Sequence, residues 1–230
     1  MFANFDFDVI SRSLRYLFVE GMTFTLTLTA LATLGGVVFG TALALMRLSS
    51  FRLLSVPAAS YVNFMRSLPL VLVIFWFYFL VPYIGQWITG ASRPTQVGPF
   101  WSSLVTFMLF EAAYFCEIMR AGIQSIARGQ VQAAYALGLN YRQAMTYIVL
   151  PQAFRNMLPV LLTQTIILFQ DTSLVYVLSI TDFLGAASKV AQRDGRLVEM
   201  YLFAAAVYFV ICLAASLLVR RLNSRVAILR

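Results

Sequence analysis

The amino-acid sequence predicts an all-α integral membrane protein with five transmembrane helices. Of its 230 residues, 61% are hydrophobic and only 11% are charged, whereas soluble domains average about 45–50% apolar and about 25% charged residues. The mean hydropathy of +0.82 points the same way. Because a spanning helix needs about 20 apolar residues, the length allows roughly five or six spans with short loops. It leaves no room for a soluble catalytic domain.

Residues 1–21 are predicted to form a short helix that lies in the membrane interface. Apolar residues recur there at helical spacing, at Phe7, Ile10, Leu14 and Leu17. Arg12 and Arg15 lie between them, as in interfacial helices. The segment carries Asp6 and Asp8 and has neither a compact apolar region nor a small-residue cleavage site, so it is not read as a cleaved signal peptide.

Residues 22–222 are predicted to form the transmembrane domain, followed by a tail over 223–230. The expected spans are about 22–46, 58–81, 100–119, 157–178 and 200–219. In the first span, Gly35, Gly36 and Gly40 are small enough to let a neighbouring helix approach closely.

The distribution of charged residues predicts the orientation in the membrane. The loops after spans one and three and the tail are basic without interspersed acids, through Arg47, Arg52, Arg120, Arg128, Arg142, Arg155, Arg220, Arg221, Arg225 and Arg230. The opposite side is mixed, with Arg12, Arg15, Arg93, Lys189, Arg193 and Arg196 beside Asp6, Asp8, Glu20, Asp182, Asp194 and Glu199. The positive-inside rule then places the N-terminus outside and the C-terminus inside. The net charge of +8 is therefore attributed to orientation rather than to nucleic-acid binding.

The loop over residues 120–150 is too long for a turn and too polar to span. Its pattern predicts two short helices, the first over about 129–137 and stopped by Gly138, a residue typical of helix ends. The second opens with Asn140 followed three residues later by Gln143, a capping-box pattern. It is expected to end before Pro151, which would begin the helix of span four. Two capped helices on the inner face indicate a docking element.

This loop resembles the EAA loop of ABC importer permeases, whose pattern is E-A-A-x3-G-x9-I-x-L-P. Every spacing of that pattern is present, and the one departure is Gln132 in place of the leading Glu. The resemblance implies a type I, MetI-like permease fold in which this loop is a cytoplasmic coupling helix. The residues it assigns to ATPase coupling are Arg128, Gln132, Ala133, Ala134, Gly138, Ile148, Leu150 and Pro151.

Three further segments are similar to motifs of polar amino acid permeases. They are YVNFMRSLPL at 61–70, AYFCEIMRAGI at 113–123 and FQDTSLV at 169–175, where Gln170 replaces the Lys of the family's K-D-T-S-L motif. The amino-acid sequence at 169–179 and at 76–78 is similar to that of glutamate/aspartate permeases. Glutamine and basic amino acids stay open as alternative substrates.

The resemblance also implies the partners. They are a sister permease subunit in a heterodimer, two ATPase subunits and a periplasmic binding protein, in a bacterial inner membrane. ATP and Mg are expected on the ATPase, and neither a cofactor nor a metal is expected on this chain. Rocking of the permease pair would expose the substrate path to each side in turn.

Ionisable residues within spans are costly and usually face a cavity or a partner. Asp171 has two interpretations: it receives the α-ammonium group of the substrate, aided by the hydroxyls of Thr172 and Ser173, or it caps a helix break. Glu111 has no cation nearby in the sequence and is expected to face the interior of the permease dimer, where it is assigned with Asp171, Thr172 and Ser173 to the substrate pathway. Glu117 lies three residues before Arg120, which predicts a structural ion pair.

Two other classes of protein are disfavoured. A stand-alone secondary transporter would need internal inverted repeats and usually more spans. A membrane enzyme would need a polar catalytic cluster, yet the chain has no His and its only lysine is Lys189. Cys116 and Cys212 lie in apolar runs and are expected to be small buried hydrophobic residues.

Overall fold

The computed structural model describes residues 5–94 and 97–226, and for residues 225–226 only the backbone. In these residues every regular element is helical. Five helical stretches are long and apolar enough to cross a membrane: Phe7–Leu48, Leu70–Thr89, Pro99–Gln124, Tyr141–Leu178 and Leu197–Ser224. The predicted fold class and number of spans are thereby confirmed. Residues 1–4 of the expected first segment and 227–230 of the expected tail lie outside the described residues.

The first span is one continuous helix rather than an interfacial helix followed by a span. It consists of α1 (Phe7–Arg15), a π-helical turn (Tyr16–Met22) and α2 (Thr23–Leu48). The helix does not end at the expected boundary after residue 21. The side chain of Asp6 caps its start by accepting the N–H of Asp8 at 2.9 Å.

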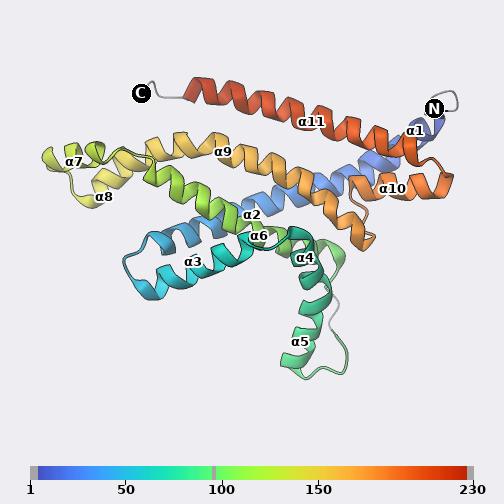
Figure 1. Cartoon of the computed structure of the whole chain (residues 1–230), viewed down its shortest axis with the longest axis horizontal. Coiled ribbons are helices and arrows are strands. Elements are labelled where there is room, and N and C mark those ends of the chain that lie inside the picture. The colour runs from blue at the N-terminus through green and yellow to red at the C-terminus, as the bar shows by residue number, and fades with distance from the viewer. Residues whose placement is uncertain (1–4, 95–96, 227–230) are drawn as a thin grey trace.

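The predicted second span over 58–81 is wrong, because the chain breaks at Ser67–Pro69. α3 (Arg52–Arg66) ends before the break, and α4 (Leu70–Phe75), a π turn (Trp76–Leu80) and α5 (Val81–Thr89) follow it. Pro69 has no N–H and disfavours helical geometry in the residue before it. The membrane-crossing stretch therefore starts at Leu70. α4 and α5 project away from the other helices (Figure 1).

The third span is α6 (Pro99–Gln124), which packs along α2 at the centre of the molecule (Figure 1). Small residues on α2 permit this contact, as predicted. A Cβ atom on Gly40 would lie 3.0 Å from the carbonyl oxygen of Ala112, and one on Gly36 would lie 3.0 Å from the ring of Phe115. Since a backbone atom is one of these neighbours, the two helices approach too closely for a larger residue at position 40.

The remaining elements run from one end of the molecule to the other and back. α7 (Arg128–Ala136), α8 (Tyr141–Gln143) and a π turn (Ala144–Val149) lead into α9 (Leu150–Asp171). A 3-10 helix (Thr172–Leu178), α10 (Phe183–Asp194) and α11 (Leu197–Val226) complete the chain. α7 and the last turn of α11 lie at the end opposite α1 and α10 (Figure 1).

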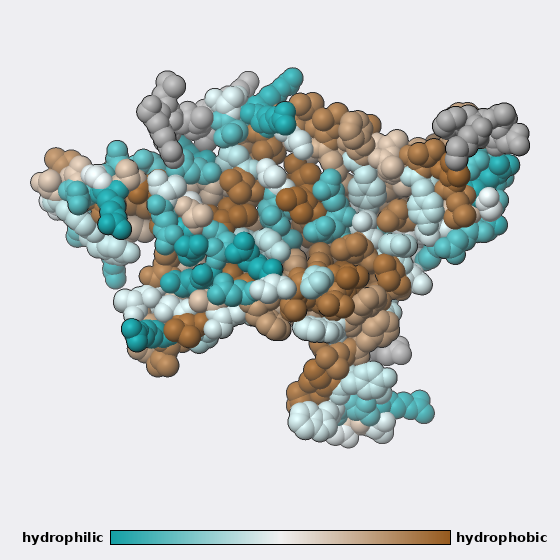
Figure 2. Space-filling model, in the orientation of Figure 1, coloured by the Kyte–Doolittle hydropathy of each residue, from teal (hydrophilic) through white to brown (hydrophobic). Residues whose placement is uncertain are grey.

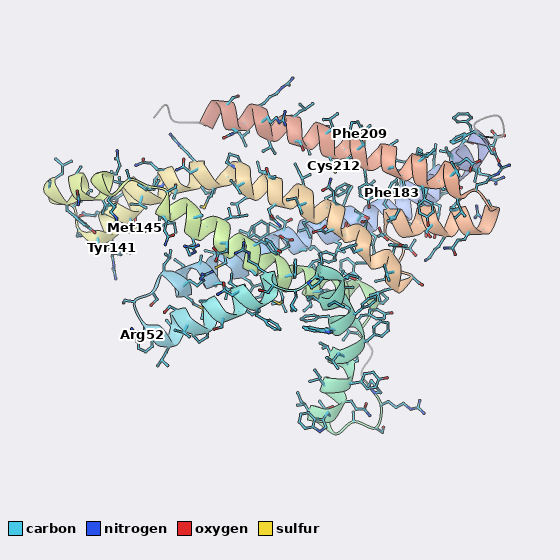
Figure 3. The ribbon with its side chains drawn as sticks, viewed as in Figure 1. Arg52, Tyr141, Met145, Phe183, Phe209 and Cys212 are labelled. Carbon is cyan, nitrogen blue, oxygen red and sulfur yellow. The ribbon has the colours of Figure 1, made fainter. Side chains whose placement is uncertain are left out.

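The start of α10 is stabilised by apolar packing and by a helix cap. Phe183 at the start of α10 is buried between α10 and α11 and contacts the ring of Tyr208 (Figure 3). The carboxylate of Asp182 accepts the N–H groups of Leu184 and Gly185, each at 3.0 Å. Burial raises the pKa of Asp182 to about 7, against the lowering effect of the two backbone hydrogen bonds.

Candidate functional site: a coupling hairpin and a polar helix face

The turn between α7 and α8 depends on Gly138. Its φ of +81° lies in the left-handed region, which costs a residue with a Cβ roughly 1–2 kcal/mol. The N–H of Gly138 donates to Tyr135 and that of Leu139 to Ala134, so α7 ends in a Schellman motif. The capping box also forms, with Asn140 and Gln143 each bonding the other's backbone N–H. The glycine at position 138 and the Asn140–Gln143 capping box, both predicted from the sequence, therefore determine the conformation of the hairpin.

The hairpin turns only a small face toward the rest of the chain. Ala134 is buried against the π turn, where Ala144 and Val149 are also buried. Arg128, Gln132, Ala133 and Gly138 are exposed. Four large side chains are exposed as well, namely Tyr135, Leu137, Tyr141 and Tyr147. Leu137 is 82% exposed, so the hairpin presents apolar surface that the described part of the chain does not cover. Figure 3 shows Tyr141 and Met145 at this end of the molecule.

The hairpin is joined to the membrane by a continuous helix, which corrects the expected break before Pro151. Residues 141–178 form one helical stretch. Pro151 lacks an N–H and would clash with a carbonyl one turn earlier, and the π turn over Ala144–Val149 precedes it. Wider π turns accommodate such a residue without ending the helix. The same arrangement recurs at Trp76–Leu80 before Pro82. Ile148 and Leu150 thus lie within the connecting helix itself, which runs without a break from the hairpin into α9.

A polar pair joins the inner faces of α6 and α9. Glu111 is fully buried on α6, and its carboxylate accepts a hydrogen bond of 3.0 Å from the side-chain amide of Gln164 on α9. Gln164 was not singled out from the sequence. Its spacing of seven residues from Asp171, which places both on one face of α9, is the signal that could have found it.

Asp171 lies at the end of α9, and its side chain makes no capping hydrogen bond. The interpretation of Asp171 as a helix cap is therefore wrong in this conformation. Within the described residues it has no hydrogen-bond or ion-pair partner, and it is half-buried. Thr172 is fully buried and its hydroxyl donates to the carbonyl of Phe169 at 2.7 Å. Ser173 is half-buried beside it. Of this trio, Asp171 has the carboxylate available for a ligand.

Glu117 is the centre of an ion cluster larger than the predicted pair. Arg120 donates to it at 2.7 Å, as the spacing suggested. Arg47 from α2 also contacts its carboxylate, and Arg66 from α3 lies 3.9 Å away. The guanidinium of Arg66 additionally lies over the ring of Tyr114, 5.4 Å from its centroid. One carboxylate thereby ties the ends of α2, α3 and α6 together.

We expect Glu117→Gln to lower the melting temperature of the purified complex. The substitution leaves three guanidinium groups facing one another without a carboxylate, at a site where Glu117 is only 17% exposed. A loss of about 1.5–3 kcal/mol is expected for hydrogen bonds to a charged group, and each kcal/mol shifts the melting temperature of a chain this size by roughly 2–4 °C. Glu20→Gln, on an exposed side chain, is the matched control. Equal melting of the two variants would contradict the role of the cluster.

The comparisons with known proteins agree with this geometry. Residues 36–228 match the family described as "Binding-protein-dependent transport system inner membrane component". The chain is 54% identical over 224 residues to the glutamate/aspartate import permease protein GltK of Escherichia coli O6:H1, covering 97% of this chain and 99% of that protein. It is 31% identical to the glutamine transport system permease protein GlnP of Escherichia coli K12, covering 98% and 100%.

Solved structures show the same fold. A crystal structure of an amino acid ABC transporter with histidines contains a chain that is 32% identical, with a TM-score of 0.86 and coverage of 96% of this chain and 98% of that one. An inward-facing MetNI methionine ABC transporter matches with a TM-score of 0.73 at 18% identity, covering 93% and 97%. With a family match and a closely similar relative each extending over most of its length, this chain belongs to the family of binding-protein-dependent transport system inner membrane components.

Proposed function

We propose that this chain is the membrane-spanning subunit of an ATP-driven importer for glutamate and aspartate. The observation that carries the proposal is 54% identity to a glutamate/aspartate import permease over 97% of the chain. The exposed hairpin at α7 and α8 supports the ATP-driven part, because it is a rigid element joined directly to a transmembrane helix. In this assignment the chain itself performs no catalysis.

The partners follow from the surfaces that the chain leaves uncovered. The exposed aromatic side chains Tyr135, Tyr141 and Tyr147 suit a docking contact, since aromatic residues dominate the energetics of protein interfaces. We assign the hairpin to one of two ATPase subunits, which bind ATP and Mg. A sister permease subunit would pair with this chain as a heterodimer, and a periplasmic binding protein would deliver the substrate.

The orientation in this proposal has the N-terminus in the periplasm and the C-terminus in the cytoplasm. The arginine-rich segments lie at the α7 end of the molecule (Figure 1), with Arg47 at the end of α2, Arg120 near the end of α6, Arg128 in α7 and Arg142 in α8. The mixed-charge segments lie at the α10 end, where Asp194 pairs with Arg12 and Arg193. An excess of arginine favours the cytoplasmic side.

Transport would couple the hairpin to the polar face of α6 and α9. Closure of the ATPases displaces the hairpin, and the unbroken helix from Tyr141 carries that displacement to Gln164 and Asp171. Asp171 would receive the α-ammonium group of the amino acid. The carboxylates of an acidic substrate then require positive partners elsewhere in the assembled complex.

The test is ATP hydrolysis by the complete complex in nanodiscs, with binding protein added empty or loaded with glutamate, aspartate, glutamine or arginine. We expect stimulation by the glutamate and aspartate forms alone. Stimulation by glutamine or arginine instead would retain the importer and reject the substrate. Hydrolysis that no loaded binding protein stimulates would count against the importer assignment itself.

A further inference from the structure

A polar pocket of about 440 Å³ lies between α2, α3 and α6. It shares no lining residue with the polar face of α6 and α9, and it lies at the ends of α2 and α6 that are near α7 (Figure 1). Its polar lining consists of Arg47, Ser55, Ser60, Asn63, Arg120 and Gln124. None of these lining residues is acidic. Figure 2 shows hydrophilic residues gathered over this part of the surface.

The pocket has an excess of positive charge. Its two arginines belong to the cluster in which Arg47, Arg66 and Arg120 share the single carboxylate of Glu117. Three cations and one anion leave this cluster with a net charge of +2. The Arg47 side chain is only 16% exposed and that of Arg120 is 30% exposed. Partly desolvated cations in excess are unfavourable unless an anion joins them.

Neutral hydrogen-bond donors face the same space. Ser60 and Asn63 lie three residues apart on one face of α3. Among the described residues, neither side chain has a hydrogen-bond partner, whereas Gln124 is held by Arg120 at 2.6 Å. Guanidinium groups flanked by uncharged donors are a recurrent arrangement for phosphate oxygens.

An apolar rim adjoins the pocket on the side of α3: Val56 is one of the lining residues, and Phe51 and Leu53 lie close to it in the sequence. Phe51, Leu53 and Val56 are 56%, 75% and 57% exposed. Phe51 precedes α3, and Leu53 and Val56 lie in its first two turns, next to Arg52, which Figure 3 labels. A soluble anion would leave these apolar side chains uncovered, whereas the acyl chains of a lipid would cover them. Basic pockets between transmembrane helices at a membrane surface bind anionic headgroups.

We propose that this pocket binds the phosphate group of an anionic phospholipid in the leaflet on the α7 side. The phosphate lies between Arg47 and Arg120, accepts hydrogen bonds from Ser60 and Asn63, and its acyl chains cover the apolar rim. The single negative charge of the lipid phosphate thereby lowers the net charge of the Glu117 cluster from +2 to +1.

Native mass spectrometry of the delipidated complex tests this site, with phosphatidylglycerol, phosphatidylcholine and inorganic phosphate as probes. We expect phosphatidylglycerol to be retained at least about tenfold more strongly than phosphatidylcholine. Asn63→Asp puts a carboxylate in the pocket without touching an ion pair and should weaken retention at least about fivefold. Asn223→Asp, the same change on the exposed end of α11, should leave it unchanged. If Asn63→Asp fails to assemble, Ser60→Leu removes one donor without adding charge and is expected to weaken retention as well.

Three results would overturn the proposal. Equal retention of the two lipids would show that the pocket does not discriminate between lipids by their charge. Equal behaviour of the position-63 and position-223 variants would place the lipid elsewhere. Full displacement of the lipid by millimolar inorganic phosphate would assign the pocket to a soluble phosphate.

Discussion

Gly138→Asp is expected to reduce amino acid uptake by at least about tenfold while the protein still inserts into the membrane. The residue has a φ of +81°, and a Cβ there would meet no atom of the chain within 4 Å. The cost within this chain is therefore conformational, roughly 1–2 kcal/mol, and it falls on the turn that holds the hairpin. A displaced hairpin also carries a new negative charge into the proposed ATPase contact. Each 1.4 kcal/mol of binding free energy corresponds to a factor of ten in the binding constant.

Gly129→Asp is the matched control for this experiment. Gly129 lies in the first turn of α7 without a positive φ and with open space around it. An acidic residue near a helix N-terminus is favourable, so this variant adds the same charge without straining the backbone. Uptake and membrane level are measured for both variants by radiolabelled substrate and immunoblot. Wild-type uptake by Gly138→Asp would contradict the coupling role, and equal losses in both variants would assign the effect to charge alone.

The local signals in the sequence were sufficient for the hairpin. The Asn140–Gln143 capping box and the glycine at position 138 each act through neighbouring residues, so a short pattern determines them. The number of spans was also accessible, because composition over about 20 residues decides whether a helix crosses a membrane.

Two of the errors come from prolines. The hydropathy averaged over 58–81 is high because residues 70–81 are strongly apolar, so this window looks like one span although the helix breaks at Ser67–Pro69. Pro151 gave the opposite error, since a π turn accommodates it and the helix continues. Whether a proline breaks a helix depends on which neighbouring elements stabilise the wider turn, and that information is tertiary.

The charge cluster was only partly predictable for the same kind of reason. The Glu117–Arg120 pair is local, with a spacing of three residues. Arg47 is 70 residues away from Glu117 in the sequence and reaches it only because α2 packs on α6. Gln164 likewise meets Glu111 across 53 residues. Long-range polar contacts of this kind follow from helix packing, which a single sequence does not specify.

Asp171→Asn is expected to reduce uptake at least about tenfold, with a much smaller change in the amount of protein in the membrane. A carboxylate within a spanning segment is unfavourable unless a partner compensates it, and in the described residues Asp171 has neither a cap nor an ion pair. Its loss should therefore cost the fold little. If it receives the α-ammonium group of the substrate, replacing the charge by an amide removes a charge-assisted hydrogen bond at the moment of transport.

Asp8→Asn serves as the control for this variant, because it makes the same chemical change on an exposed side chain of α1. It should leave both uptake and protein level unchanged. A proportional fall of uptake and protein level in Asp171→Asn would mean that the carboxylate supports the fold. A fall in uptake alone would place the ammonium group of the substrate at the end of α9, in the helical stretch that begins at the hairpin.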